Sequence, residues 1–125
     1  MRIVYHASRL LLGIIFITGA VNAVWIHVLG HASFMPLNEK ATNLILETHY
    51  LYTLVKIFET AGAMLLLLNK YVGLGALILS PVVGNILFMH IVWDPGFVPV
   101  ALLMVVAEAI LIWKFRSRYR VLFER

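Results

Sequence analysis

Two ionisable residues three positions apart, Lys56 and Glu59, interrupt the otherwise apolar stretch "LVKIFETAGAMLLLL". On a helix, residues at this spacing share a face, and Tyr52 lies one turn further along the same face. A charged side chain facing hydrocarbon is costly, so we expect both groups to face the protein interior, where they find hydrogen bonds or a counter-charge. The chemistry open to them is ion pairing, binding of a polar ligand head, or proton transfer.

Polar side chains of three apolar segments fall at two common depths. At a rise of about 1.5 Å per residue, the deeper group lies roughly 10 to 12 Å from the outer ends of the segments and comprises Asn22, Glu59 and Asn85. By the same count, about 3 to 7 Å from those ends lie His27, Lys56 and His90. The predicted site therefore comprises Lys56, Glu59, Asn22, Asn85, His90, His27 and Tyr52.

This polar site has two interpretations. In the functional one, the deeper layer is the floor of a small cavity that opens outward, where polar groups orient a ligand head or carry protons. In the structural one, Lys56 and Glu59 form an internal ion pair, or a protonated Glu59 bonds to Asn22 or Asn85, and the groups only fix helix register. Residue types leave both open and identify no ligand.

A second deep acid, Glu108, lies about 9 Å from the inner end of the fourth apolar segment by the same rise. It is a secondary candidate, either continuing a proton path below Glu59 or, when protonated, bonding to a neighbour. No metal is predicted: His27 and His31 are four apart, but Gly30 separates them and no carboxylate stands at a metal-motif spacing. The chain has no cysteine, phosphate loop or nucleophile elbow, so thiol, nucleotide and soluble-type hydrolase chemistry are not expected.

The elements that must position these groups are membrane-spanning helices. Hydrophobic residues make up 62% of the 125 residues, well above the half that is usual in soluble domains. The apolar segments long enough to cross a bilayer are residues 10–29, 51–68, 71–93 and 97–113. Since very short turns join the last three, they are antiparallel neighbours. We therefore predict an all-α membrane protein, with residues 1–125 forming one antiparallel bundle of four transmembrane helices.

The basic residues predict an orientation. If both termini lie on one side, nearly all Lys and Arg residues fall on that side, and only Lys40 falls on the other, apart from Lys56 within a span. The positive-inside rule then places both termini in the cytoplasm, and this topology explains the net charge of +4 without nucleic acid. The first 23 residues also resemble a cleavable signal peptide, but hydrophobicity continues to Leu29, which favours an uncleaved span. In the outer loop, residues 30–50, Asn38 could cap a helix that carries Ala41, Leu44, Ile45 and Thr48.

Three stretches carry a family resemblance: "RLLLGIIFITGAVNAV", "KIFETAGAMLLLLNKYVGLGALILSPVVGNILFMH" and "ALLMVVAEAILIW". Together they resemble the DoxX-like membrane protein family, which includes DoxD-type subunits. The matching positions are Arg9 and Gly13, Glu59 with Gly62 and residues 65–68, and Glu108. The resemblance implies a four-span protein of a prokaryotic cytoplasmic (inner) membrane, and for some members an association with quinone-linked oxidation or redox complexes.

Three functions are compatible with these features. The leading hypothesis is a membrane subunit or ligand-binding protein of a redox system, at most part of a quinone-linked oxidoreductase, which holds a quinone or lipid-like molecule. The second is a non-catalytic anchor or assembly protein, whose basic tail "KFRSRYRVLFER" docks a partner protein or anionic lipid. The third is a small proton-coupled transporter, which would have to act as a homo-oligomer. Membrane lipid, a redox partner protein and a second copy of the chain are thus the expected partners.

Overall fold

The computed structural model describes residues 1–35, 39–40, 43 and 47–124. Its long helices are α1 (Arg2–His27), α3 (His49–Leu67), α4 (Val72–Trp93) and α5 (Val98–Tyr119), and two short 3-10 helices, η1 (Pro95–Phe97) and η2 (Arg120–Phe123), flank α5. All four long helices are apolar and long enough to cross a membrane. The predicted all-α, four-helix membrane architecture is confirmed.

The helix bounds differ from the predicted spans mainly at the two ends of the chain. Helix α1 begins at Arg2 rather than residue 10, and α5 continues to Tyr119 rather than 113, because polar residues beyond the apolar core extend a helix without spanning hydrocarbon. Asn38, Ala41, Leu44 and Ile45 of the predicted loop helix lie outside the described residues, whereas Thr48 is the N-cap of α3.

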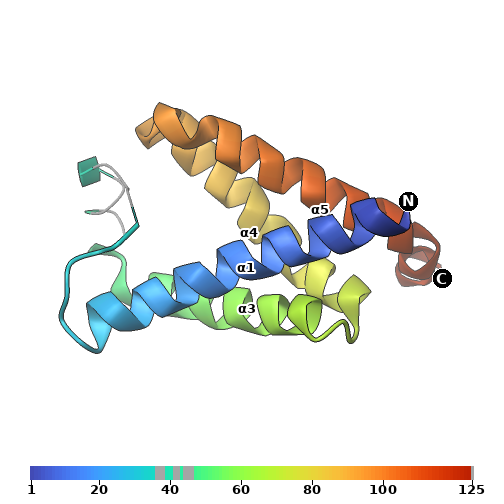
Figure 1. Ribbon diagram of the computed structural model, residues 1–125, viewed down its shortest axis with the longest axis horizontal. Helices are drawn as coiled ribbons and strands as arrows, with labels where there is room; N and C mark the ends of the chain where they lie inside the picture. The colour runs from blue at the N-terminus through green and yellow to red at the C-terminus, as the bar shows by residue number, and fades with distance from the viewer. Residues whose placement is uncertain (36–38, 41–42, 44–46, 125) are drawn as a thin grey trace.

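The four helices form a ring in which α1 packs on α3, α3 on α4, α4 on α5, and α5 on α1. Both termini lie at one end of the bundle, which we call the termini end, and the α1 to α3 and α4 to α5 connections lie at the other, the loop end (Figure 1). Figure 1 also shows that the α1/α3 pair and the α4/α5 pair diverge toward the loop end. Buried Leu12, Leu66, Leu79 and Leu111 form the core between them, and large apolar side chains on the outer faces of all four helices are exposed. A helix that is apolar on both its inner and outer faces fits a lipid environment.

Polar contacts tie the termini end together. The guanidinium of Arg9, on α1, donates to the backbone carbonyls of Leu66 and Leu67 at the end of α3. The hydroxyl of Tyr5 donates to Oδ1 of Asn69 at 3.1 Å, and the hydroxyl of Tyr119 donates to the backbone oxygen of Gly73 at 2.6 Å. These bonds join α1 to the α3–α4 turn and α5 to α4, and Arg9 also places its positive charge at the negative end of the α3 dipole.

The α3–α4 turn, residues 68–71, has a Schellman motif, which explains how so short a connection reverses the chain. The N–H of Lys70 bonds to the carbonyl of Leu65 at 3.2 Å, and that of Asn69 bonds to Leu66 at 3.2 Å. Asn69 has a φ of 54°, the left-handed conformation that this motif requires and that asparagine tolerates better than most residues.

Candidate functional site

A cavity of about 390 Å³ lies where the two helix pairs diverge, lined by residues of α1, α3, α4 and α5 and by Met35 and Thr48 of the first loop. Most of its walls are apolar, among them Phe16, Ile86 and Met104. The predicted site residues that line it are Asn22, Tyr52, Lys56, Glu59, Asn85 and His90. The structure thus brings together every member of the predicted set except His27.

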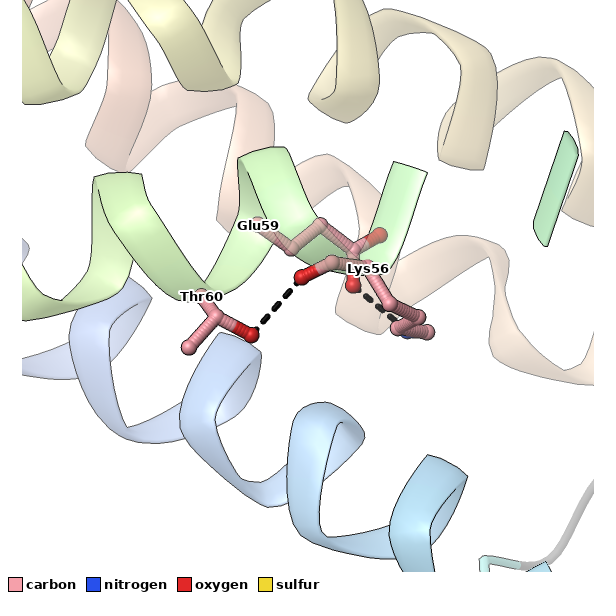
Figure 2. Close-up of polar contacts among 3 residues, drawn as sticks. All are labelled: Lys56, Glu59 and Thr60. Atoms are coloured by element: carbon pink, nitrogen blue, oxygen red, sulfur yellow. Dashed lines mark hydrogen bonds and ion pairs between the residues drawn. The ribbon is translucent and has the colours of Figure 1, made fainter. Parts of the chain in front are cut away.

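The ion pair of Lys56 and Glu59 lies on the α3 side of this cavity. Nζ of Lys56 is 2.5 Å from Oε2 of Glu59, and the two side chains meet along the same face of α3 (Figure 2). The hydroxyl of Thr60 donates to the backbone carbonyl of Lys56 at 2.7 Å, a hydrogen bond within α3 next to the ion pair (Figure 2). Glu59 is only 3% exposed, whereas the Lys56 side chain is 19% exposed. The carboxylate is therefore the buried partner of the pair, and the lysine is the more exposed one.

Gly19 of α1 stands opposite this ion pair and explains how the pair fits between two helices. A Cβ at this position would lie 3.2 Å from Nζ of Lys56 and 3.9 Å from Oε2 of Glu59. The absence of a side chain lets the α1 backbone approach the charged atoms. The ion pair of α3 therefore lies directly against the α1 backbone.

His90 lines the opposite wall, at the end of α4. Its Nδ1 lies 4.0 Å from Oδ2 of Asp94, and its ring stacks on Phe97 with centroids 5.6 Å apart. Asp94 is buried and is not among the predicted site residues. Its i, i+4 spacing from His90 is the signal that could have identified this second pair of polar groups.

Asn22 lines the cavity, but its hydrogen bonds go to the first loop rather than to Glu59 or Asn85. Its Nδ2 donates to Oγ of Ser33 at 3.1 Å, and its Oδ1 accepts the N–H of Phe34 at 3.1 Å. The chain after α1 is thus folded back onto the loop end of the cavity. Spacing within apolar segments could not show this, because the partners lie in a connection without a regular period. Asn85, by contrast, has an exposed side chain in the cavity wall, where its amide can reach a ligand.

His27 lies elsewhere, in an open groove of about 830 Å³ on the outer side of α1 and α3. Its ring is 4.9 Å from that of His49 and 5.1 Å from that of Tyr52. The predicted outer layer of His27, Lys56 and His90 is therefore divided between two spaces. Depth along a helix does not determine the direction in which a side chain points. His27 is five positions after Asn22, so at 3.6 residues per turn its side chain is rotated about 140° from that of Asn22.

The secondary candidate Glu108 does not line the cavity. It is 5% exposed and lies one turn beyond Met104 on the same face of α5, toward the termini end. Neither of its carboxyl oxygens has a hydrogen-bond partner among the described residues. Among the residues that the structure describes, no group of three or more His, Cys, Asp or Glu side chains is placed to hold a metal ion.

The fold and the cavity define a class: a small multi-pass membrane protein with a partly buried ion pair beside a cavity between its helix pairs. Comparison of the chain with protein-family models, curated proteins and solved structures gives no match. The resemblance to the DoxX-like family stays a prediction.

Proposed function

We propose that this protein is a membrane ligand-binding protein that holds a small amphipathic molecule in the cavity between the α1/α3 and α4/α5 pairs. The observation that carries the proposal is the space beside the Lys56–Glu59 pair. An ion pair that only fixed helix register would need no such space, whereas this one lines a cavity of about 390 Å³. That volume lies within the range of about 300 to 1,000 Å³ typical of small-molecule sites, which combine apolar walls with a few polar groups.

The cavity residues have distinct roles in this proposal. Lys56 is the accessible partner of the ion pair, so its ammonium donates to the polar head of the ligand while Glu59 balances its charge. Asn85, on the facing helix, offers both a donor and an acceptor. His90 and Tyr52 line the same cavity, and the apolar walls receive the body of the ligand.

A quinone has this combination of a polar head and an apolar body, and so has a single-chain lipid. The finer form of the proposal is a subunit of a quinone-linked redox system in a prokaryotic cytoplasmic membrane, with both termini in the cytoplasm. The cavity chemistry and the resemblance to the DoxX-like family support that form, and the distribution of basic residues supports the orientation.

Mass spectrometry of protein purified from native membranes tests the proposal. We expect the wild type to carry one class of amphiphile and the variant Glu59→Gln, which leaves Lys56 without a counter-charge, to retain at least tenfold less. Glu108→Gln is the matched control, since Glu108 is equally buried but lies outside the cavity, and it should retain the ligand. A short-chain quinone added to the delipidated wild type should raise its thermal stability if the quinone form is right.

Two results would contradict the proposal. One is a wild-type preparation that carries no specific molecule, and the other is equal loss of ligand in Glu59→Gln and Glu108→Gln. Either would favour the structural interpretation of the ion pair, and with it the anchor or assembly role.

A further inference from the structure

The cavity and the outer groove share two lining side chains, which form part of the wall between the two spaces. Tyr52 and Lys56 line both spaces, the cavity on one side and the groove on the other. Nζ of Lys56 lies 5.2 Å from the centroid of the Tyr52 ring, so the two side chains lie close together in this wall. The groove runs along the outer side of α1 and α3, with a floor that includes Ala20 and Ala61.

We propose that this wall is a lateral gate, and that the ligand is a bilayer amphiphile that enters from the groove, its polar head passing between α1 and α3 while its hydrocarbon chain lies in the groove. This inference rests on the proposed function, because it assumes that the cavity is a binding site. It adds the route of access and a requirement on the ligand, namely a long hydrocarbon chain. The occupant of the groove is therefore a lipid chain rather than a protein partner.

The loop end of the cavity is the alternative entrance, and the first loop narrows it. Ser33 and Phe34 are held to Asn22 by hydrogen bonds, and Met35 and Thr48 are part of the cavity wall. A water-borne molecule would have to pass these groups. The groove has no such cover among the described residues, and its walls are largely apolar, as a hydrocarbon chain requires.

Lys56 is suited to be the moving part of the gate. Its ammonium is held by Glu59 on the cavity side, and Gly19 leaves the α1 backbone open to it. The four-carbon stem of a lysine is flexible, so a change of rotamer can move the ammonium without moving either helix. Glu59 is then the latch, since the attraction between the two groups keeps the wall closed until a polar head offers Lys56 another partner.

The absence of cysteine from the chain allows a direct test with one introduced thiol. Met104→Cys places it in the cavity at a buried position of α5, and Ile57→Cys places it in the groove at an exposed position. Each protein, reconstituted in lipid nanodiscs with both aqueous faces accessible, is treated with dodecyl maleimide, which partitions into the bilayer, or with a sulfonated maleimide, which stays in water. Dodecyl maleimide itself has a polar head and a hydrocarbon chain.

We expect dodecyl maleimide to label Met104→Cys at least tenfold faster than the sulfonated reagent does. Adding Lys56→Ala should speed dodecyl labelling of the cavity thiol about tenfold further, and leave labelling of Ile57→Cys unchanged. Lys56→Met, which keeps the length of the side chain, should have a smaller effect, because bulk as well as charge closes the wall. Tyr52→Ala should act like Lys56→Ala and provides a second variant if the first does not fold.

Faster labelling of the cavity thiol by the sulfonated reagent would overturn the lateral gate and indicate access from the loop end. An unchanged dodecyl rate in both Lys56→Ala and Tyr52→Ala would also overturn it. Ligand retention in the wild type is measured separately from these rates, so the gate can fail while ligand retention still supports the proposed function.

Discussion

The two ends of this bundle use polar groups in opposite ways. At the termini end, Arg9 and Tyr5 bond to the backbone and side chain of the α3–α4 turn and bring the helices together. At the loop end, Lys56 and Glu59 bond to each other within one helix, and they lie beside a cavity between separated pairs. Contacts between helices stabilise the bundle, whereas a pair within one helix leaves the facing helices free to move apart.

Three glycines, Gly62, Gly13 and Gly84, show a difference in helix packing between the two ends. A Cβ at Gly62 would lie 2.5 Å from Cγ of Leu79, and one at Gly13 would lie 2.7 Å from Cδ2 of Leu67, so the helices touch closely toward the termini end. At Gly84, on the loop-end half of α4, a Cβ would have no neighbour within 4 Å. Small residues allow the close helix approach on which membrane helices depend for association. We infer that one half of the bundle supplies most of the stability, and that the other half can therefore tolerate a cavity.

The largest predicted effect on stability is at the close contact between Gly62 of α3 and Leu79 of α4. Gly62→Val should lower the free energy of unfolding by about 3 kcal/mol, at the upper end of overpacking costs, because Leu79 is fully buried and cannot move aside. Gly84→Val is the matched control and should have little effect. SDS-induced unfolding in mixed micelles, followed by circular dichroism, measures both. Equal losses in the two variants would show that the ends do not differ in packing.

A smaller effect is expected at the polar tie between α1 and α3. Arg9→Leu should cost about 2 kcal/mol, the usual magnitude for hydrogen bonds to a charged group, because two carbonyls at the end of α3 lose their donor. Arg118→Leu, at an exposed position of the α5 tail, is the control and should leave the unfolding midpoint nearly unchanged. If both substitutions act alike, Arg9 contributes through net charge rather than through its position.

Much of this architecture follows from hydrophobic runs and short connections, which the sequence displays directly. The four spans and the inward position of Glu59 were predictable, since a long apolar segment has few stable alternatives and a charge within it must find a partner. The divergence of the two pairs was not, because it depends on which faces touch and how closely. The close contacts at Gly62 and Gly13 determine which helix faces touch, and the sequence does not show which side chains these glycines contact.

The candidate site was predictable to the same degree. Depth counting and helix spacing identified six polar side chains that line the cavity, but depth counting also placed His27 among them, although that ring lies in the outer groove. It also placed Asn22 at the depth of Glu59, as one of two possible partners of a protonated Glu59, whereas Asn22 bonds to Ser33 and Phe34. In both cases the missing information was direction around the helix and the path of a loop, neither of which hydrophobic periodicity contains.

The smallest predicted effect on stability is at the Lys56–Glu59 ion pair, on the loop-end half of the bundle. The double variant Lys56→Met/Glu59→Gln removes both charges. It should change the free energy of unfolding by less than about 1 kcal/mol, because exchanging an ion pair in the protein interior for neutral groups of similar volume is often nearly neutral. The same double variant should lose the bound amphiphile, because the ammonium that meets its head is gone. SDS unfolding and mass spectrometry on one preparation measure the two properties together. A large loss of stability would mean that the pair holds the bundle together as Arg9 does, and the functional difference between the two ends would then disappear.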